Sequence, residues 1–138
     1  MDSRRIAVFF YGLFMDATEL TTKGVFPLNI RRSSLPGFAL RIGQRATLVP
    51  EPVNRVHGML MDLTHGEIDM LYAEPSVAMY RPEAVLCELL DGSIAPALCF
   101  NLPVPPALGE SNPQYAEKLR NLARRLQLPN DYVERIGT

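Results

Sequence analysis

The stretch Ile6-Ala-Val-Phe-Phe-Tyr11-Gly12 carries the clearest structural signal in the chain. Its continuous apolar run, Ile6–Tyr11, is typical of a β-strand buried on both faces. Gly12 ends the run, and without a Cβ it lets another group approach the backbone closely. We therefore predict a buried strand that ends at Gly12.

Further strands are predicted downstream of this run. Pro36-Gly37 is a turn signal before a strand over Phe38–Ile42. Ala46–Val49 is a second strand, which we expect Pro50 and the proline two positions later to end. Val56–Leu63 is a third, and the glycine inside it predicts a bulge or a tight bend.

The second half of the chain holds a hairpin signal. Two apolar-rich runs, Tyr80–Leu90 and Ile94–Leu102, flank Asp91-Gly92, a dipeptide strongly favoured in tight β-hairpin turns. The sequence therefore predicts an antiparallel pair of strands here.

Short helices are predicted between and after the strands. Asp16–Glu19 and Thr64–Glu67 resemble capping boxes. Apolar residues recur at helical spacing from Tyr115 to Leu126, behind a cap at Ser111 or Asn112 and a proline suited to the first turn. After Pro129 breaks that helix, Asn130 is expected to cap a last short one.

Composition narrows the class of protein. Twelve of 138 residues are proline, against a usual content of ~5%, which excludes a bundle of long helices. The net charge of −1 argues against a nucleic-acid-binding surface, and no apolar run reaches the ~20 residues of a membrane-spanning helix. We predict a single α+β domain over residues 1–138, with five to seven strands in a mixed or closed sheet and a few short flanking helices.

The near-zero net charge conceals a segmented distribution. Residues 56–114 hold eight acidic residues and one basic residue, Arg81, whereas both flanking segments are basic. Two interpretations stay open for this acidic segment. Its carboxylates lie on solvated strand edges, or one of them is catalytic.

Several familiar catalytic and metal-binding motifs are absent from the sequence. It has no spaced Cys/His cluster, no glycine-rich phosphate loop and no Gly-x-Ser-x-Gly elbow. The two cysteines, Cys87 and Cys99, lie in apolar runs, which favours reduced thiols in the core over a disulfide. An enzyme of this composition would have to use carboxylates, tyrosines and backbone donors.

The order of motifs along the chain resembles the gamma-glutamylcyclotransferase-like family. That family opens with a buried strand ending in Tyr-Gly-[Ser/Thr]-Leu, to which Tyr11-Gly12-Leu13 is similar. Its Leu-Pro-Gly-aromatic turn resembles Leu35–Phe38, and its next two strands resemble Ala46–Pro50 and Val56–Leu63.

The resemblance continues to the end of the chain. A short helix with Leu-Asp, a catalytic Glu and a later Tyr correspond to Ile68-Asp69, Glu74 and Tyr80. The C-terminal Pro-x-Tyr helix and its Leu-Pro-x-x-Tyr end resemble Pro113–Tyr115 and Leu128–Tyr132. The resemblance therefore spans nearly the whole sequence.

The resemblance implies a small mixed β-barrel and a reaction. A cyclotransferase of this type converts a small γ-glutamyl amine or amino acid to 5-oxoproline and releases the free amine. Glu74 would be the general acid/base, its pKa raised by burial among apolar neighbours. The segment Tyr11, Gly12, Leu13 and Phe14 would hold the substrate α-carboxylate through backbone N–H groups, and Tyr80 would orient the substrate.

The resemblance also implies the surroundings of such an enzyme. It would work in the cytoplasm on a small γ-glutamyl molecule, as a monomer or homodimer. No cofactor, metal, nucleic acid or membrane is expected to take part.

Three departures from the family pattern bear on the activity. Leu13 stands where the family has a small hydroxyl residue, and Pro75 stands where glycine is usual. Glu74 follows Asp69 by five positions, whereas the commoner family spacing is three. Glu83 is therefore a fallback carboxylate. A non-catalytic small-ligand-binding module that keeps the barrel pocket is the alternative interpretation.

Overall fold

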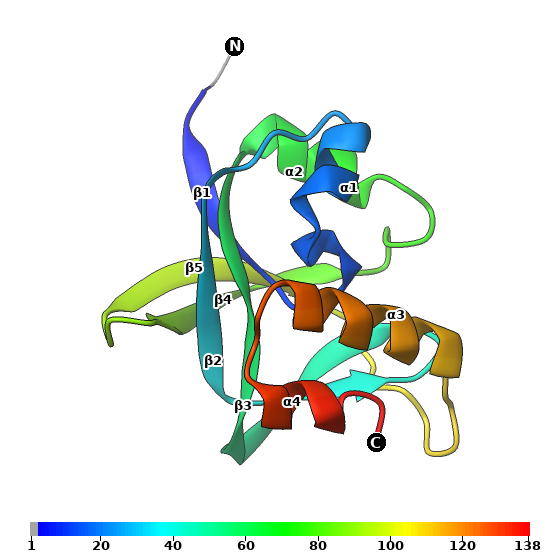
Figure 1. The fold of residues 1–138 in the computed structure, drawn as a ribbon. Helices are drawn as coiled ribbons and strands as arrows, with labels where there is room; N and C mark the ends of the chain where they lie inside the picture. The colour runs from blue at the N-terminus through cyan, green and yellow to red at the C-terminus, as the bar shows by residue number, and fades with distance from the viewer. Residues whose placement is uncertain (1–2) are drawn as a thin grey trace.

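A computed structural model describes residues 3–138 and shows five strands closed into a barrel, flanked by four short helices (Figure 1). The strand order around the barrel is β1-β3-β2-β4-β5, and β1 pairs in parallel with β5 to close it. All other pairs are antiparallel, so the sheet is mixed, as predicted. The strands are β1 (Arg5–Phe10), β2 (Leu28–Ile42), β3 (Ala46–Thr64), β4 (Arg81–Leu89) and β5 (Ile94–Asn101).

The helices begin where the sequence predicts caps, with one exception. The Asp16 carboxylate accepts from the Thr18 N–H, and the Asn112 side chain accepts from the Tyr115 N–H. Asn130 is the exception, because it is the first residue of its helix and not the cap. The helices are α1 (Ala17–Thr22), α2 (His65–Tyr72), α3 (Pro113–Arg125) and α4 (Asn130–Arg135). No helix in the described part of the chain is long and apolar enough to cross a membrane.

Three predicted strand boundaries are wrong. Pro36-Gly37 is not a turn before a strand at Phe38, because both residues lie inside β2, which begins at Leu28. The prolines at 50 and 52 do not end a strand, because β3 runs through both of them to Thr64. Along this part β3 pairs with β2 alone, and β1 joins it only from Met59 onward. A proline that lacks an N–H is tolerated on such an edge. The register also shifts between Pro36 and Phe38, opposite these prolines, so the ladder is already interrupted there.

Gly58 does not mark a bulge, contrary to the prediction. It pairs regularly with Ser33, and the register shifts of β2 and β3 lie elsewhere. A Cβ at Gly58 would lie 2.3 Å from the backbone oxygen of Phe10. Glycine at this position therefore lets the end of β1 lie close against β3.

The barrel interior and the inner face of α3 form one apolar core. Val8, Phe9 and Leu60 are almost completely buried, and α3 adds Leu119 and Ala123. Within this core the two cysteines are buried and free, as predicted. Helix α3 also packs against the 3₁₀ turn at residues 13–15, which carries the segment that follows β1.

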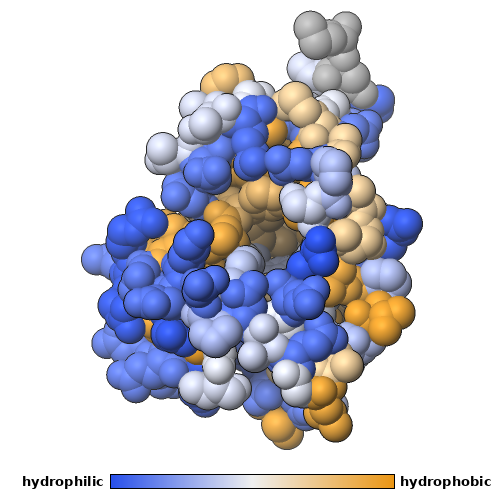
Figure 2. All heavy atoms as spheres, turned by 90° about the vertical axis from the view of Figure 1, so that its right-hand side faces the viewer, coloured by the Kyte–Doolittle hydropathy of each residue, from blue (hydrophilic) through white to orange (hydrophobic). Residues whose placement is uncertain are grey.

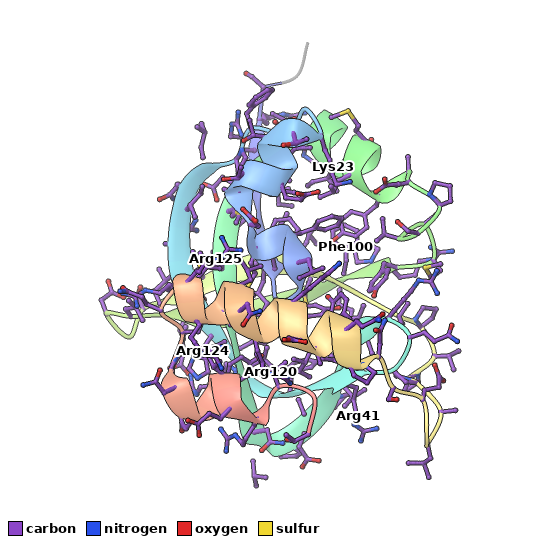
Figure 3. The ribbon with its side chains drawn as sticks, turned by 45° about the vertical axis from the view of Figure 1, so that its right-hand side comes forward. Lys23, Arg41, Phe100, Arg120, Arg124 and Arg125 are labelled. Carbon is purple, nitrogen blue, oxygen red and sulfur yellow. The ribbon has the colours of Figure 1, made fainter. Side chains whose placement is uncertain are left out.

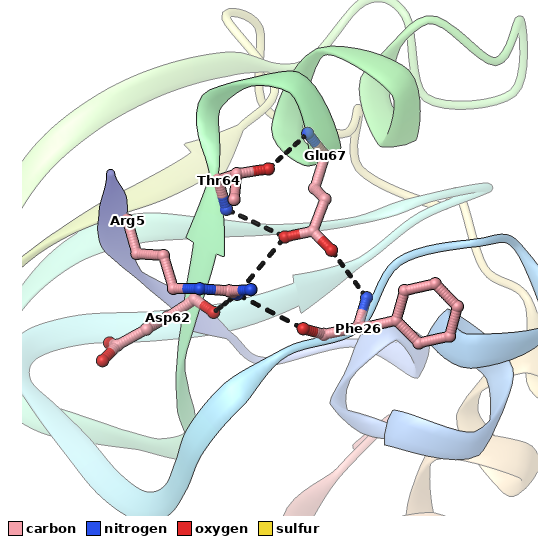
Figure 4. Close-up of polar contacts among 5 residues, drawn as sticks. All are labelled: Arg5, Phe26, Asp62, Thr64 and Glu67. Atoms are coloured by element: carbon pink, nitrogen blue, oxygen red, sulfur yellow. Dashed lines mark hydrogen bonds and ion pairs between the residues drawn. The ribbon is translucent and has the colours of Figure 1, made fainter. Parts of the chain in front are cut away.

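A partly buried glutamate fixes the start of α2 (Figure 4). The Glu67 carboxylate accepts from the backbone N–H of Thr64 at 2.9 Å and of Phe26 at 2.7 Å. The Thr64 hydroxyl in turn accepts from the Glu67 N–H and so caps the helix. Arg5 lies 3.4 Å from the same carboxylate and also donates to the backbone oxygens of Phe26 and Asp62. This network joins β1, β3, α2 and the segment before β2, and so holds α2 in place on the barrel.

Candidate functional site

A cavity of about 880 Å³ lies at the end of β1. Its walls come from the Tyr11–Phe14 segment, α1, the end of α2 with the turn after it, and α3. Figure 2 shows a hollow with a largely hydrophobic floor and a rim that is mostly hydrophilic. Such a concave, mostly apolar site with a few polar groups is typical of a small-ligand pocket.

The segment after β1 is held in place by side-chain and backbone hydrogen bonds. The Tyr11 hydroxyl donates to the backbone oxygen of Phe100 at 2.7 Å, and the Met15 N–H donates to the Gly12 oxygen at 3.0 Å. Tyr11, Gly12, Leu13 and Phe14 all line the cavity. The structure therefore brings the four predicted binding residues to one wall.

Tyr115 of α3 lines the cavity, although the sequence indicated only that it lies on the apolar face of a helix. Its hydroxyl lies 2.7 Å from where a Cβ at Gly12 would be, and it hydrogen-bonds with the backbone of Leu13. A hydroxyl is thus present beside Leu13 although residue 13 itself carries none. The Pro113-Gln-Tyr115 motif was the only signal in the sequence for this placement.

Four of the aromatic residues that line the cavity are tyrosines, namely Tyr11, Tyr72, Tyr80 and Tyr115. Burial raises the pKa of Tyr80 and of Tyr115 to about 12, and it also raises the pKa of Tyr11 and of Tyr72 well above the usual value. All four hydroxyls are therefore neutral at pH 7 and are able to donate hydrogen bonds. None is ionised to act as a base, which leaves carboxylates for that role.

Tyr80, predicted to orient substrate, lines the cavity with its hydroxyl already engaged. The hydroxyl donates to the backbone oxygen of Ala46. Its ring tilts against that of Tyr72, with centroids 6.4 Å apart. Tyr80 thereby ties the turn after α2 to the start of β3.

Glu74 lies on the wall of the same cavity as the Tyr11–Phe14 segment, on the turn that follows α2. The Lys23 ammonium donates to both carboxylate oxygens of Glu74, at 3.5 Å to Oε1 and 3.3 Å to Oε2. The Glu74 side chain is 46% exposed, so the expected burial among apolar neighbours is wrong. The carboxylate is instead a solvated group at the cavity rim, paired with one cation.

Tyr72 occupies the position three residues after Asp69, where the commoner family spacing has its glutamate. Its ring stacks on Phe100 with centroids 3.9 Å apart, and it meets Phe14 edge-on at 5.9 Å. The inner wall at the end of α2 is therefore aromatic. The carboxylate lies two residues further on, at the rim.

The fallback carboxylate, Glu83, lies away from the cavity. It is on β4 and accepts from the Asn101 side-chain amide at 2.7 Å. Glu83 is not among the residues that line the cavity, which are the set 9–14, 16, 19, 23, 44–46, 72, 74, 76, 77, 80, 100, 115, 118, 121, 122 and 125. Within residues 3–138 no group of three or more His, Cys, Asp or Glu side chains is placed to hold a metal ion.

This barrel, with a pocket where β1 ends, has the gamma-glutamylcyclotransferase-like fold. The chain is similar to a solved gamma-glutamyl cyclotransferase, with a TM-score of 0.79 and 18% identity over 96% of this chain and 86% of the other. It is equally similar to an uncharacterized protein from Homo sapiens, with a TM-score of 0.79 and 18% identity over 97% and 87% of the two chains.

A third solved structure, of YkqA from Bacillus subtilis, has a TM-score of 0.76 and 25% identity to the chain. The match covers 94% of this chain and 52% of YkqA, so the chain spans about half of that protein. No protein-family model and no curated protein matches the sequence. At these identities the likeness confirms the predicted fold, and the chemistry has to be argued from the site.

Proposed function

We propose that the protein is a cyclotransferase that converts small γ-glutamyl amines or amino acids to 5-oxoproline and releases the free amine. One observation carries the proposal. Glu74, a carboxylate able to move protons, and the Tyr11–Phe14 segment, which offers backbone donors, line one cavity. The tyrosine hydroxyls of that cavity are neutral at pH 7, so Glu74 is the better base than any of them.

The reaction closes a five-membered ring. The substrate α-amine attacks the γ-carbonyl carbon, a C–N bond forms, and Glu74 takes the proton that the amine loses. Glu74 then returns the proton to the departing nitrogen as the γ-amide bond breaks. Both partners belong to one molecule, so a cavity that holds the glutamyl group folded removes much of the entropic barrier.

Binding of the α-carboxylate falls to the segment after β1. The Tyr115 hydroxyl lies beside Gly12 and Leu13, where it adds a neutral donor to the backbone N–H groups. Such donors favour an anion without the cost of burying a countercharge. In this proposal Tyr115 supplies the hydroxyl that the family carries at position 13.

A non-catalytic binding module is the second candidate function, and Tyr72 is the observation that favours it. The inner wall at the end of α2 carries this tyrosine, whereas the carboxylate of Glu74, two residues further on, is partly exposed and paired with Lys23. A base so placed is reached by water as easily as by substrate. The cavity would then hold a γ-glutamyl compound or 5-oxoproline without turning it over.

Turnover of γ-glutamyl-alanine separates the two candidates. The cyclotransferase should release 5-oxoproline and alanine in equal amounts, measured by mass spectrometry and amine derivatisation. Calorimetric titration with 5-oxoproline runs in parallel. Binding without release of 5-oxoproline would favour the module, and absence of both binding and turnover would overturn both candidates.

A further inference from the structure

The rim of the cavity carries basic side chains that lack acidic partners. Lys23 pairs with Glu74, and Arg125 lies 3.9 Å from Asp16. By contrast, no carboxylate among residues 3–138 lies within 4.0 Å of Arg45 or Lys118, the other two basic residues of the lining. Glu19 is the one acidic residue of the lining without an ion-pair partner among the described residues, so the lining keeps an excess of one positive charge. This excess attracts an anionic group of a ligand.

Arg45 is the basic residue that the structure ties to the turn bearing Glu74. It lies between β2 and β3, and its Nε donates to the backbone oxygen of Ser76 at 3.0 Å. Ser76 follows Glu74 by two positions and lines the cavity with it. This hydrogen bond uses the Nε–H of the guanidinium and leaves the two Nη groups for a ligand. Lys118, on the exposed side of α3, has no comparable anchor among the described residues.

Arg45 lies close to where the leaving group of the substrate is expected to bind. In the proposed reaction the departing nitrogen receives its proton from Glu74, so the group attached to that nitrogen lies near the turn at residues 74–77. Arg45 contacts this turn, whereas the Tyr11–Phe14 segment takes the α-carboxylate in the proposed reaction. A guanidinium here would bind a carboxylate on the leaving group.

We propose that Arg45 is a specificity-determining residue that selects γ-glutamyl compounds whose leaving part is an amino acid over those whose leaving part is a neutral amine. The inference rests on the proposed function, because it takes the orientation of the substrate from it. The substrate class is thereby narrowed to dipeptide-like molecules with two carboxylates, one held by the Tyr11–Phe14 segment and one by Arg45.

Two compounds that differ only in the second carboxylate test the inference: γ-glutamyl-alanine and γ-glutamyl-ethylamide. Their affinities are measured by calorimetry in a Glu74→Gln background, which keeps both compounds intact. With Arg45 present, γ-glutamyl-alanine should bind about tenfold more tightly. Arg45→Gln should abolish this preference without changing the affinity for the ethylamide, and Arg45→Lys should restore part of it.

Arg41→Gln is the matched control, because Arg41 is an exposed arginine of β2 that does not line the cavity, so its loss should keep the preference (Figure 3). Equal affinities for the two compounds, or a preference that survives Arg45→Gln, would overturn the inference. Failure of both compounds to bind would overturn it together with the proposed function. A thermal melt of each variant shows that the fold is retained.

Measuring turnover by the wild-type chain tests the cyclotransferase reaction independently of the Arg45 subsite. An Arg45-dependent preference in binding with no release of 5-oxoproline would refute the cyclotransferase and retain the Arg45 subsite. Release of 5-oxoproline from both compounds, in a ratio of kcat/KM that Arg45→Gln leaves unchanged, would retain the reaction and refute the subsite.

Discussion

Two glutamates stand at the two ends of α2, seven residues apart, and the structure treats them differently. Glu67, at the start, has a side chain 13% exposed that accepts two backbone N–H groups and an ion pair from Arg5. Glu74, just past the end, has a side chain 46% exposed whose one described partner is Lys23.

The comparison shows how one residue type acquires two roles. The oxygens of Glu67 are occupied by groups that belong to the fold, so protonating or replacing it disturbs the fold. The oxygens of Glu74 face a flexible ammonium and a cavity, so little of the fold depends on them. A carboxylate that contributes little to stability is free to take and return protons. The predictions below try to break this contrast.

Replacement of Glu74 should have the largest effect, and on catalysis alone. Glu74→Gln removes the proposed acid/base, and we expect kcat for γ-glutamyl-alanine to fall by about 10³. The free energy of unfolding should change by less than about 0.5 kcal/mol, because the pair with Lys23 is solvated. Glu83→Gln, at the carboxylate outside the cavity, should retain turnover. Unchanged turnover in Glu74→Gln would refute the assignment of the base.

Replacement of Glu67 should act on stability. Glu67→Gln presents an amide N–H to groups that donate, and we expect the free energy of unfolding to fall by about 2 kcal/mol in urea denaturation. Glu134→Gln, at an exposed position of α4, should change it by less than about 0.5 kcal/mol. An equal effect of the two variants would show that the Arg5–Glu67 network does not hold α2.

Acid should remove the contribution of Glu67. Burial opposes its ionisation, but hydrogen bonds from the Phe26 and Thr64 backbone outweigh burial and lower its pKa. The stabilisation is complete above the ordinary glutamate pKa of ~4.3 and is lost as the pH falls through the lowered value. The stability difference between wild type and Glu67→Gln should therefore shrink between about pH 5 and pH 2. A difference that stays constant over this range would contradict the assigned shift.

Replacement of Lys23 should have the smallest effect on the fold. Lys23→Gln removes the ion pair with Glu74, which joins two partly exposed side chains. We expect the free energy of unfolding to change by less than about 0.5 kcal/mol, with a salt dependence too small to detect. A loss above about 1 kcal/mol would mean that the rim is as structural as the start of α2.

The parts of the fold that the sequence predicts are those with local causes. The capping box at Thr64 and Glu67 and the hairpin turn at Asp91-Gly92 depend on residues a few positions apart. The length of β3 was missed because the cost of Pro50 depends on which neighbour its missing N–H would face, and that neighbour lies on another strand.

The site divides in the same way. The sequence by itself determined that Tyr11–Phe14 lies at the end of a buried strand and that Glu74 follows a short helix, since hydrophobic periodicity and helix caps depend on neighbouring residues. Only the tertiary structure decided that Glu74 is solvated beside Lys23, 51 residues away, that Tyr72 takes the inner wall, and that Tyr115 reaches Leu13 from α3. The exposure and the bonding partners of these side chains depend on segments that are distant in the sequence and meet only around the cavity. A local sequence pattern therefore cannot predict them.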